Sequence, residues 1–400
     1  MPSSTDARPF WCTDFLGVGP LGLELAGLPL GEVACEAGTP LYVYSRAAMR
    51  RQIAELRGAL ERVGRPYRIQ YAMKANRASD VLRVMRDEGD VAIDACSPRE
   101  VARALEHGFG ADEISVTAGM LSGADLARFA QFGVHLNLDT RSVLRRWAET
   151  PGRSTRVGLR INPEVSIGWG EEPKLQYGNS KFGFDGDEVL AAVAYATSLG
   201  LEIDTLHVHC GWGLQASAAP ALREVYRRLR GWAEAIPTVR VVNVGGGLCP
   251  RYRAEDDPLT PATWGELLAE AFGDSALTIA CEPGTFVVAP AGVLLCEVNT
   301  VEPRRSGVWV GLDAGHNANV FAAHYGIPMA ILKVAEPLAP ASERYHLAGN
   351  INEANDVFAR GRAMPVLAEG DRVAFWPAGA YGTSMASDHC MRGIPREIMI

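Results

Sequence analysis

A lysine at the end of a short alternating segment is the first residue of this chain that could do chemistry. Lys74 follows Ile69, Tyr71 and Met73, which stand at alternate positions as in a β-strand. A long amine is costly to bury in an apolar strand without a partner. If Lys74 faced a cavity, the pKa of its ammonium group could fall and the free amine could attack a carbonyl carbon. A solvated lysine that leaves the strand end is the alternative.

The segments around Lys74 predict the element that would position it. Strand-like runs recur near residues 68–74, 91–96, 113–118, 134–138, 156–161, 205–210, 239–244 and 277–282, and helix-like stretches fill most of the gaps. Eight such units over about 220 residues match a (β/α)8 barrel, with a doubly wound open sheet as the competing fold. Functional residues of a barrel lie at the carboxyl ends of its strands. Those ends carry Lys74, Asp94, Arg160, His209, Gly245–Gly247 and Glu282.

The strand and helix alternation does not cover the whole chain. It stops after Gly284, and residues 286–400 give mostly strand-like runs separated by turn residues. We therefore predict a barrel domain over 38–285 and a β-rich domain over 286–400, with residues 1–37 packing against the latter. The stretch 162–184 is rich in Gly, Pro and charge, which predicts a loop over the barrel mouth.

The last two strand ends suggest a cofactor. Three consecutive glycines after the seventh strand would let backbone N–H groups approach a phosphate, although a plain tight turn explains them equally well. Glu282, at the eighth strand end, would be unfavourable beside a phosphate unless it met a positive group. A protonated pyridine nitrogen is such a group. Together with an aldehyde captured by Lys74, these features describe pyridoxal 5′-phosphate.

These motifs resemble those of a known family. YAMKAN resembles the Schiff-base motif, HVHCGWG the ring-stacking histidine motif, NVGGG the phosphate loop, CEPGT the pyridinium motif and AGAYGTSMAS a C-terminal phosphate motif. From about residue 38 to 400 the chain resembles the barrel-type (fold type III) pyridoxal-phosphate-dependent decarboxylases, which include diaminopimelate, ornithine and arginine decarboxylases. It is nearest to the diaminopimelate branch.

The resemblance implies a role for each matching residue. Lys74 would form the Schiff base, Glu282 would keep the pyridine nitrogen protonated, and His209 would stack on the ring. It further implies substrate contacts from Tyr325 and Glu353, and a homodimer in which the partner's C-terminal domain completes each site. The implied phosphate ligands and neighbours of the ring are Gly245, Gly246, Gly247, Tyr381, Asp94 and Arg160.

Three departures from the family pattern concern the cofactor phosphate and the substrate. Trp212 replaces a phosphate-binding serine, and Thr285 and Phe321 replace two arginines that bind the distal carboxylate of diaminopimelate in that branch. Without these charge-assisted bonds a second carboxylate would be poorly held. We therefore predict a decarboxylase of an α-amino acid other than diaminopimelate, acting in a specialised biosynthetic pathway on a substrate that is free or attached to a carrier protein.

The fourth departure concerns the proton donor. Asn352 replaces the cysteine that the family uses to protonate the α-carbon, and an amide has no useful acidity near neutral pH. Lys74, water, or one of His316, His324 and His389 could replace it. Protonation at the cofactor carbon would instead give decarboxylative transamination. A non-catalytic regulator and a racemase remain as alternatives, although a racemase needs a second base opposite Lys74.

The amino-acid composition limits the classes of binding partner and the cellular compartment that we expect. The 400 residues carry 39 basic and 47 acidic side chains, for a net charge of −8, which argues against nucleic acid or an anionic membrane as the main partner. The eight cysteines form no CxxC pair and no metal-ligand spacing, which favours free thiols and no metal. No signal peptide or membrane span is evident at the start or in the apolar runs, so we expect a cytoplasmic enzyme.

Overall fold

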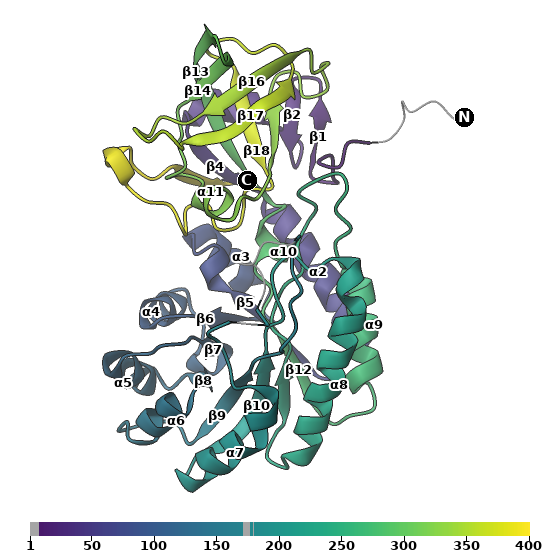
Figure 1. Cartoon of the computed structure of the whole chain (residues 1–400), viewed down its shortest axis with the longest axis vertical. Coiled ribbons are helices and arrows are strands. Elements are labelled where there is room, and N and C mark those ends of the chain that lie inside the picture. Colours follow the sequence, from purple (N-terminus) through teal and green to yellow (C-terminus); the bar gives the residue numbers. More distant parts are fainter. Residues whose placement is uncertain (1–7, 171–176, 179) are drawn as a thin grey trace, which may run out of the picture. The chain divides into compact units, whose positions relative to one another are not determined.

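The computed structural model describes residues 8–170, 177–178 and 180–400, which form two compact units (Figure 1). The barrel unit comprises Gln52–Cys249 and Asp257–Phe286. The β-rich unit comprises the described residues up to Arg51, together with Pro250–Asp256 and Val287–Ile400. No helix in this described part of the chain is both long enough and apolar enough to cross a lipid bilayer.

Eight parallel strands close the barrel, in the order β10-β11-β12-β5-β6-β7-β8-β9. The first strand pairs on both sides, since Ile69 lies opposite Val91 of the second strand and Cys281 of the last. This closure confirms the (β/α)8 barrel and excludes the open sheet. The strands are β5 (Tyr67–Ala72), β6 (Val91–Ala95), β7 (Ile114–Thr117), β8 (His135–Leu138), β9 (Arg156–Ile161), β10 (Glu202–Val208), β11 (Val241–Asn243) and β12 (Thr278–Cys281).

Helices follow the strands and surround the barrel in Figure 1. Several begin at side chains that accept a backbone N–H of the first turn, such as Ser97, Ser122 and Thr140. These caps satisfy donors that the first turn of a helix otherwise leaves unpaired. The helices are α2 (Arg46–Glu61), α3 (Ser79–Asp87), α4 (Pro98–Glu106), α5 (Gly123–Phe132), α6 (Arg141–Ala148), α7 (Val189–Ser198), α8 (Ala219–Ala235), α9 (Pro261–Phe272) and the short α10 (Thr285–Val288).

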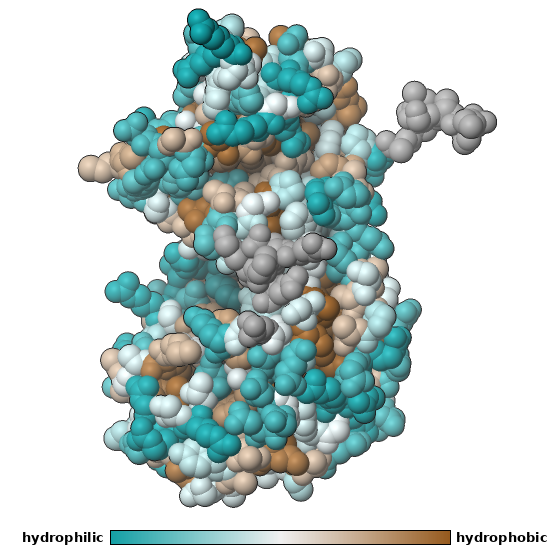
Figure 2. Space-filling model, viewed as in Figure 1, coloured by the Kyte–Doolittle hydropathy of each residue, from teal (hydrophilic) through white to brown (hydrophobic). Residues whose placement is uncertain are grey.

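Helix α8 shows why these segments lie on the outside of the barrel. Leu222, Val225 and Leu229 recur every three or four residues and are buried, so one stripe of the helix faces the strands. The opposite face is charged, and Arg223 pairs with Glu270 of α9 at 2.8 Å. On the face seen in Figure 2, the barrel unit is largely hydrophilic, with scattered hydrophobic patches.

The barrel interior contains buried polar side chains that bond to one another. Asn243 Nδ2 donates to Gln70 Oε1 at 3.0 Å, and Asn137 Nδ2 donates to Thr117 Oγ1 at 2.9 Å and to Ser115 Oγ at 3.3 Å. Buried polar groups are stable only when they are paired in this way. The barrel core is therefore a polar network rather than a purely aliphatic packing.

The second unit is built mainly from strands, which confirms the predicted β-rich domain. Its main sheet has the order β15-β18-β13-β14-β16-β17, and β4 pairs with β13 and β19. Its strands are β4 (Leu41–Tyr44), β13 (Gly292–Arg304), β14 (Gly307–Leu312), β15 (Ala330–Lys333), β16 (Glu343–Ala348), β17 (Val357–Met364), β18 (Arg372–Trp376) and β19 (Arg396–Met399), with the short helix α11 (Val320–Tyr325).

The first described residues contribute to the core of the β-rich unit. They form strands β1 (Leu16–Gly19), β2 (Gly22–Leu25) and β3 (Leu28–Pro29), followed by helix α1 (Leu30–Ala37). Leu16, Leu23 and Leu30 are fully buried in one cluster with side chains of β13 and β18. The N–H of Leu23 also donates to the carbonyl of Val334 at 2.7 Å.

Candidate active site

Lys74 lies just beyond the first barrel strand. Strand β5 ends at Ala72, and Lys74 is the middle residue of a single 3-10 turn, Met73–Ala75. The prediction of a strand through residue 74 was therefore wrong by two residues. The turn is fixed from below, because the buried Tyr71 hydroxyl donates to the carbonyl of Asn76 at 2.8 Å. Lys74 thus stands at the rim of the barrel, with 42% of its side chain exposed.

Asp94, at the end of β6, is the partner of Lys74. Lys74 Nζ lies 2.9 Å from Asp94 Oδ2, and the aspartate side chain is fully buried. Burial raises the pKa of Asp94 to about 7, and the nearby charge of Glu282 adds to that rise, although Lys74 opposes it. Among the described residues Asp94 Oδ1 has no hydrogen-bond partner. Burial therefore disfavours the ionised form of the carboxyl group in this pair.

Glu282 follows β12 and is held by three other strands. Its Oε1 accepts from Thr117 Oγ1 at 3.0 Å and from Asn243 Nδ2 at 2.9 Å, and its Oε2 lies 3.1 Å from His207 Nε2. Burial favours the neutral acid, but the contact with His207 and the charge of Lys74 outweigh burial and lower the pKa of Glu282. Glu282 is therefore a carboxylate at neutral pH.

The sequence interpretation missed the side chains that hold Glu282. Burial lowers the pKa of His207, so its imidazole is neutral and donates from Nε2. His207 and Asn243 stand within the HVHCGWG and NVGGG motifs, two residues before the groups chosen there, His209 and Gly245. Because side chains alternate along a strand, this spacing places them on the same inward face, and that signal could have identified both residues.

The glycine run forms a tight turn against Glu282 and His209. Gly245 has a φ of 68°, in the left-handed region that favours glycine. A Cβ atom on Gly246 would lie 2.4 Å from the carbonyl oxygen of Glu282, so no larger residue fits. The N–H of Gly246 donates to His209 Nδ1 at 3.2 Å. Within the described residues the N–H of Gly247 has no acceptor, which leaves it for an anion such as phosphate.

His209 is a neutral imidazole in this structure. Burial lowers its pKa to about 3, and the positive charges of Arg160 and Lys74 act in the same direction. Because Nδ1 accepts a hydrogen bond from Gly246, the ring proton is on Nε2. The ring of Tyr177 meets His209 edge-on, at 4.8 Å between centroids.

Arg160 and Asp139 lie at the ends of neighbouring strands. The Arg160 guanidinium is buried over the ring of Phe182, 4.1 Å from its centroid. Burial raises the pKa of Asp139, although Arg160 opposes that rise. Asp139 was not among the predicted site residues, and it directly follows the last residue of β8.

These side chains fit pyridoxal 5′-phosphate. A lysine amine, an ionised carboxylate, a neutral imidazole and a glycine turn come from four strand ends of one barrel. They match the aldehyde, the ring nitrogen, the ring face and the phosphate of that cofactor.

The comparisons with known proteins agree with this geometry. The sequence model of the family described as pyridoxal-dependent decarboxylase, pyridoxal binding domain, matches residues 46–289. This chain is a pyridoxal-phosphate-dependent decarboxylase of that family. Diaminopimelate decarboxylases of Methanothermobacter thermautotrophicus and Pseudomonas fluorescens are 33% and 32% identical to it, over 94% of this chain and 90% of each relative. The crystal structure of the enzyme from M. jannaschii has a TM-score of 0.87 at 25% identity, covering 96% of this chain and 92% of that one.

One prediction about this decarboxylase was wrong. We expected a substrate other than diaminopimelate, whereas relatives that match nearly the whole chain are named diaminopimelate decarboxylases. The prediction considered each departure separately. In the structure Trp212 Nε1 donates to Thr285 Oγ1 at 2.9 Å, and both residues are buried. Trp212 and Thr285, which stand in place of the serine and one arginine, therefore bond to each other, so the two departures are not independent.

The other predicted residues of this decarboxylase lie in the β-rich unit. Tyr381 has a φ of 56° and stacks on Phe321 with 5.0 Å between ring centroids. Phe321 in turn contacts Tyr325 at 5.3 Å, so the third departure is part of an aromatic cluster.

The segment that contains Asn352 is exposed and is bordered by two histidine–carboxylate contacts. Glu353 Oε1 lies 3.2 Å from His389 Nε2, and Asp356 Oδ1 lies 3.3 Å from His316 Nδ1. The rings of the two histidines are 6.0 Å apart. Two of the three predicted alternative acids therefore lie together, each beside a carboxylate, whereas His324 packs against Tyr325.

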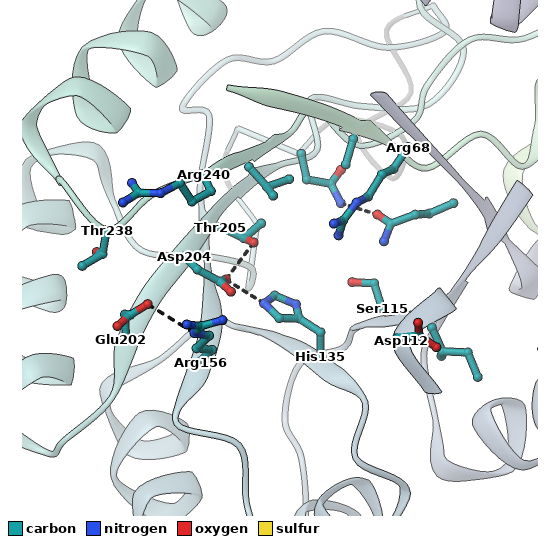
Figure 3. Close-up of a pocket in the computed structure, with 15 residues that line it drawn as sticks. Arg68, Asp112, Ser115, His135, Arg156, Glu202, Asp204, Thr205, Thr238 and Arg240 are labelled. Carbon is teal, nitrogen blue, oxygen red and sulfur yellow. Dashed lines mark hydrogen bonds and ion pairs between the residues drawn. The ribbon is translucent and has the colours of Figure 1, made fainter. Parts of the chain in front are cut away.

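A cavity lies at the other end of the barrel. It has a volume of about 470 Å³ and lies at the amino ends of the strands (Figure 3). His135 pairs there with Asp204 at 2.8 Å, and Arg156 with Glu202 at 3.4 Å. None of the predicted site residues lines this cavity.

Proposed function

We propose that this decarboxylase removes one carboxylate of diaminopimelate as CO2 and yields lysine. The observation that carries the proposal is the similarity to enzymes named diaminopimelate decarboxylase over 94% of the chain. Further support comes from a solved structure of such an enzyme complexed with L-lysine, which has a TM-score of 0.83 at 26% identity.

We propose that the carboxyl end of the barrel holds the cofactor. Bound pyridoxal phosphate would supply an electron sink for the bond that breaks. Lys74 is the amine that binds its aldehyde, and Glu282 is the carboxylate that keeps its ring nitrogen protonated. The neutral face of His209 suits stacking, because a cationic ring would repel a protonated pyridine. Gly245–Gly247 and Tyr381 are the proposed phosphate ligands, with Arg160 beside the ring.

Asp94 is the proposed proton store for Lys74. An amine attacks a carbonyl carbon only after it has lost its proton. Asp94 Oδ2 lies 2.9 Å from Lys74 Nζ, and its pKa of about 7 lets it accept that proton and return it near neutral pH. Asp94 thereby sets how easily Lys74 is released and recaptured.

The substrate contacts proposed here come from the β-rich unit of a homodimer. Thr285 and Phe321 are uncharged, so the hydroxyl of Tyr325 is the proposed donor to the distal carboxylate, and Glu353 the acceptor for the distal ammonium. Asn352 cannot donate a proton to the α-carbon. The adjacent pairs His389–Glu353 and His316–Asp356 support a histidine in that role. We propose the cytoplasm as the compartment, because free thiols such as the eight cysteines of this chain are typical of reducing surroundings.

An amino-acid panel tests the proposal. The purified protein, loaded with pyridoxal phosphate, is incubated with diaminopimelate, lysine, ornithine, arginine and glutamate, and released CO2 and amino-acid products are measured. We expect CO2 and lysine in equal amounts from diaminopimelate only. CO2 from another member of the panel, with none from diaminopimelate, would contradict the proposed substrate.

A further inference from the structure

Asn243 uses every hydrogen-bonding atom of its side chain. It is the last residue of β11 and is 1% exposed. The two protons of Nδ2 go to Glu282 Oε1 at 2.9 Å and to Gln70 Oε1 at 3.0 Å. Its Oδ1 accepts from the N–H of Gly245 at 2.9 Å. An inverted amide would set N–H groups against each other at Gly245, so only one orientation satisfies all three partners.

These bonds join two parts of the site into a closed ring. The N–H of Glu282 donates to the carbonyl of Gly245 at 2.8 Å, while the carboxylate of Glu282 and the N–H of Gly245 meet on the side chain of Asn243. The carboxylate and the glycine turn cannot move independently while this ring is intact. Gln70, which is buried and borders the amino-end cavity, anchors Asn243 from below.

We propose that Asn243 is a positioning residue that couples the contact with the cofactor's ring nitrogen to the contact with its phosphate. The inference rests on the proposed function only in taking Glu282 and the glycine turn as those two contacts. When Glu282 is held in place by the ring nitrogen, Asn243 also holds the glycine turn in the shape that fits an anion. Binding at one end of the cofactor therefore strengthens binding at the other.

Thr117 provides a matched control. Its hydroxyl donates to the same oxygen, Glu282 Oε1, at 3.0 Å, and it accepts from Asn137 Nδ2 at 2.9 Å rather than from the glycine turn. Thr117→Val removes one bond to the carboxylate with little change of shape. Asn243→Ala removes a bond to the same carboxylate together with the bond to Gly245.

The experiment compares three ligands on the cofactor-stripped full chain: pyridoxal phosphate, pyridoxal, which lacks the phosphate, and inorganic phosphate. Affinities are measured by tryptophan fluorescence and calorimetry. We expect Thr117→Val to weaken pyridoxal by about fivefold and to leave inorganic phosphate within twofold. Asn243→Ala should weaken pyridoxal and inorganic phosphate each by about tenfold. An Asn243→Ala protein that binds phosphate as tightly as the wild type would overturn the coupling, as would equal phosphate losses in both variants.

A wild-type measurement covers the case in which Asn243→Ala does not fold. Amide hydrogen exchange is followed at residues 244–248 and 281–284 after adding pyridoxal alone. We expect both segments to gain protection, although pyridoxal has no phosphate to contact the glycine turn. Protection confined to 281–284 would contradict the inference. A wild-type chain that binds none of the three ligands refutes the proposed function itself, which separates the two failures.

Discussion

Two carboxylate contacts of almost equal length lie at opposite ends of the barrel, and the pKa values of their aspartates shift in opposite directions. Lys74 and Asp94 are 2.9 Å apart at the carboxyl end, and His135 and Asp204 are 2.8 Å apart at the amino end. The pKa of Asp94 is raised to about 7, whereas the pKa of Asp204 is lowered. Burial opposes ionisation at both sites. It prevails only at Asp94, which is fully buried and close to the charge of Glu282.

A cavity at one end of the barrel does not by itself identify the catalytic site. The amino end has a cavity of about 470 Å³, but the His135–Asp204 and Arg156–Glu202 contacts that line it are partly exposed and already complete (Figure 3). The carboxyl end brings together buried groups whose pKa values are shifted, among them Asp94, His209 and Glu282. Shifted, buried groups that face one another are the stronger sign of a catalytic site.

Loss of the amine at the carboxyl end should have the largest effect. Lys74→Ala removes the amine that we propose binds the aldehyde, so we expect at least a 10³-fold fall in CO2 release and loss of the absorbance band of the bound cofactor. Lys333→Ala, which removes a lysine of the β-rich unit, is the control and should leave both readouts unchanged. If the Lys74→Ala protein still released CO2, the assignment of the active site to the carboxyl end of the barrel would be wrong.

Glu282→Gln should have the next largest effect. The amide has nearly the same shape but no negative charge to stabilise a protonated ring nitrogen, so we expect kcat to fall about 10²- to 10³-fold. At the amino end, Asp204→Asn makes the same change of a paired carboxylate and should alter kcat by less than twofold. Equal losses in both variants would contradict the functional contrast between the two ends.

The two aspartates should respond oppositely to pH. The folded pKa of Asp94 is above its unfolded value of 3.8, so its contribution to stability falls as pH rises from about 4 to about 7. In cofactor-free protein, Asp94→Asn should therefore gain stability over that range relative to wild type, by up to about 4 kcal/mol. Because the folded pKa of Asp204 is lowered, its contribution is present above the unfolded pKa and lost in acid. Asp204→Asn should lose stability relative to wild type as pH rises from acid to about 4. Urea unfolding at pH 2.5, 4, 6 and 8 covers both windows.

A smaller effect is expected at the contact between Trp212 and Thr285. Thr285→Val removes the acceptor of the buried Trp212 indole N–H while keeping the shape of the side chain, which should lower the free energy of unfolding by about 1–2 kcal/mol. Thr285→Ser keeps the hydroxyl and serves as the control. If the two variants have equal urea midpoints, the hydrogen bond contributes nothing measurable.

The smallest change is expected at the rim of the amino end. Arg156 and Glu202 are 3.4 Å apart, and their side chains are 70% and 46% exposed. Exposed pairs contribute little, so Arg156→Gln should shift the free energy of unfolding by less than about 0.5 kcal/mol and leave kcat unchanged. A larger loss would show that the amino end has a role beyond closing the barrel.

The substrate could not be predicted from single positions of the sequence. Reading Thr285 and Phe321 as lost arginines predicted a new substrate, and the whole-chain similarity shows that this prediction was wrong. A single position shows which group has gone but not what its new neighbours do. The bond between Trp212 and Thr285 joins residues 73 positions apart, and nothing in the local sequence predicts it.

The amino-acid sequence by itself determined the barrel, the β-rich domain and the cofactor, because hydrophobic periodicity and short motifs are local properties of the chain. The tertiary structure alone decided the state of each group at the site. Glu282 meets Thr117, which is 165 residues away, and His207, which is 75 residues away. Such meetings exist only once eight strands close, and the burial that closure brings is what shifts the pKa of Asp94 in one direction and that of Glu282 in the other.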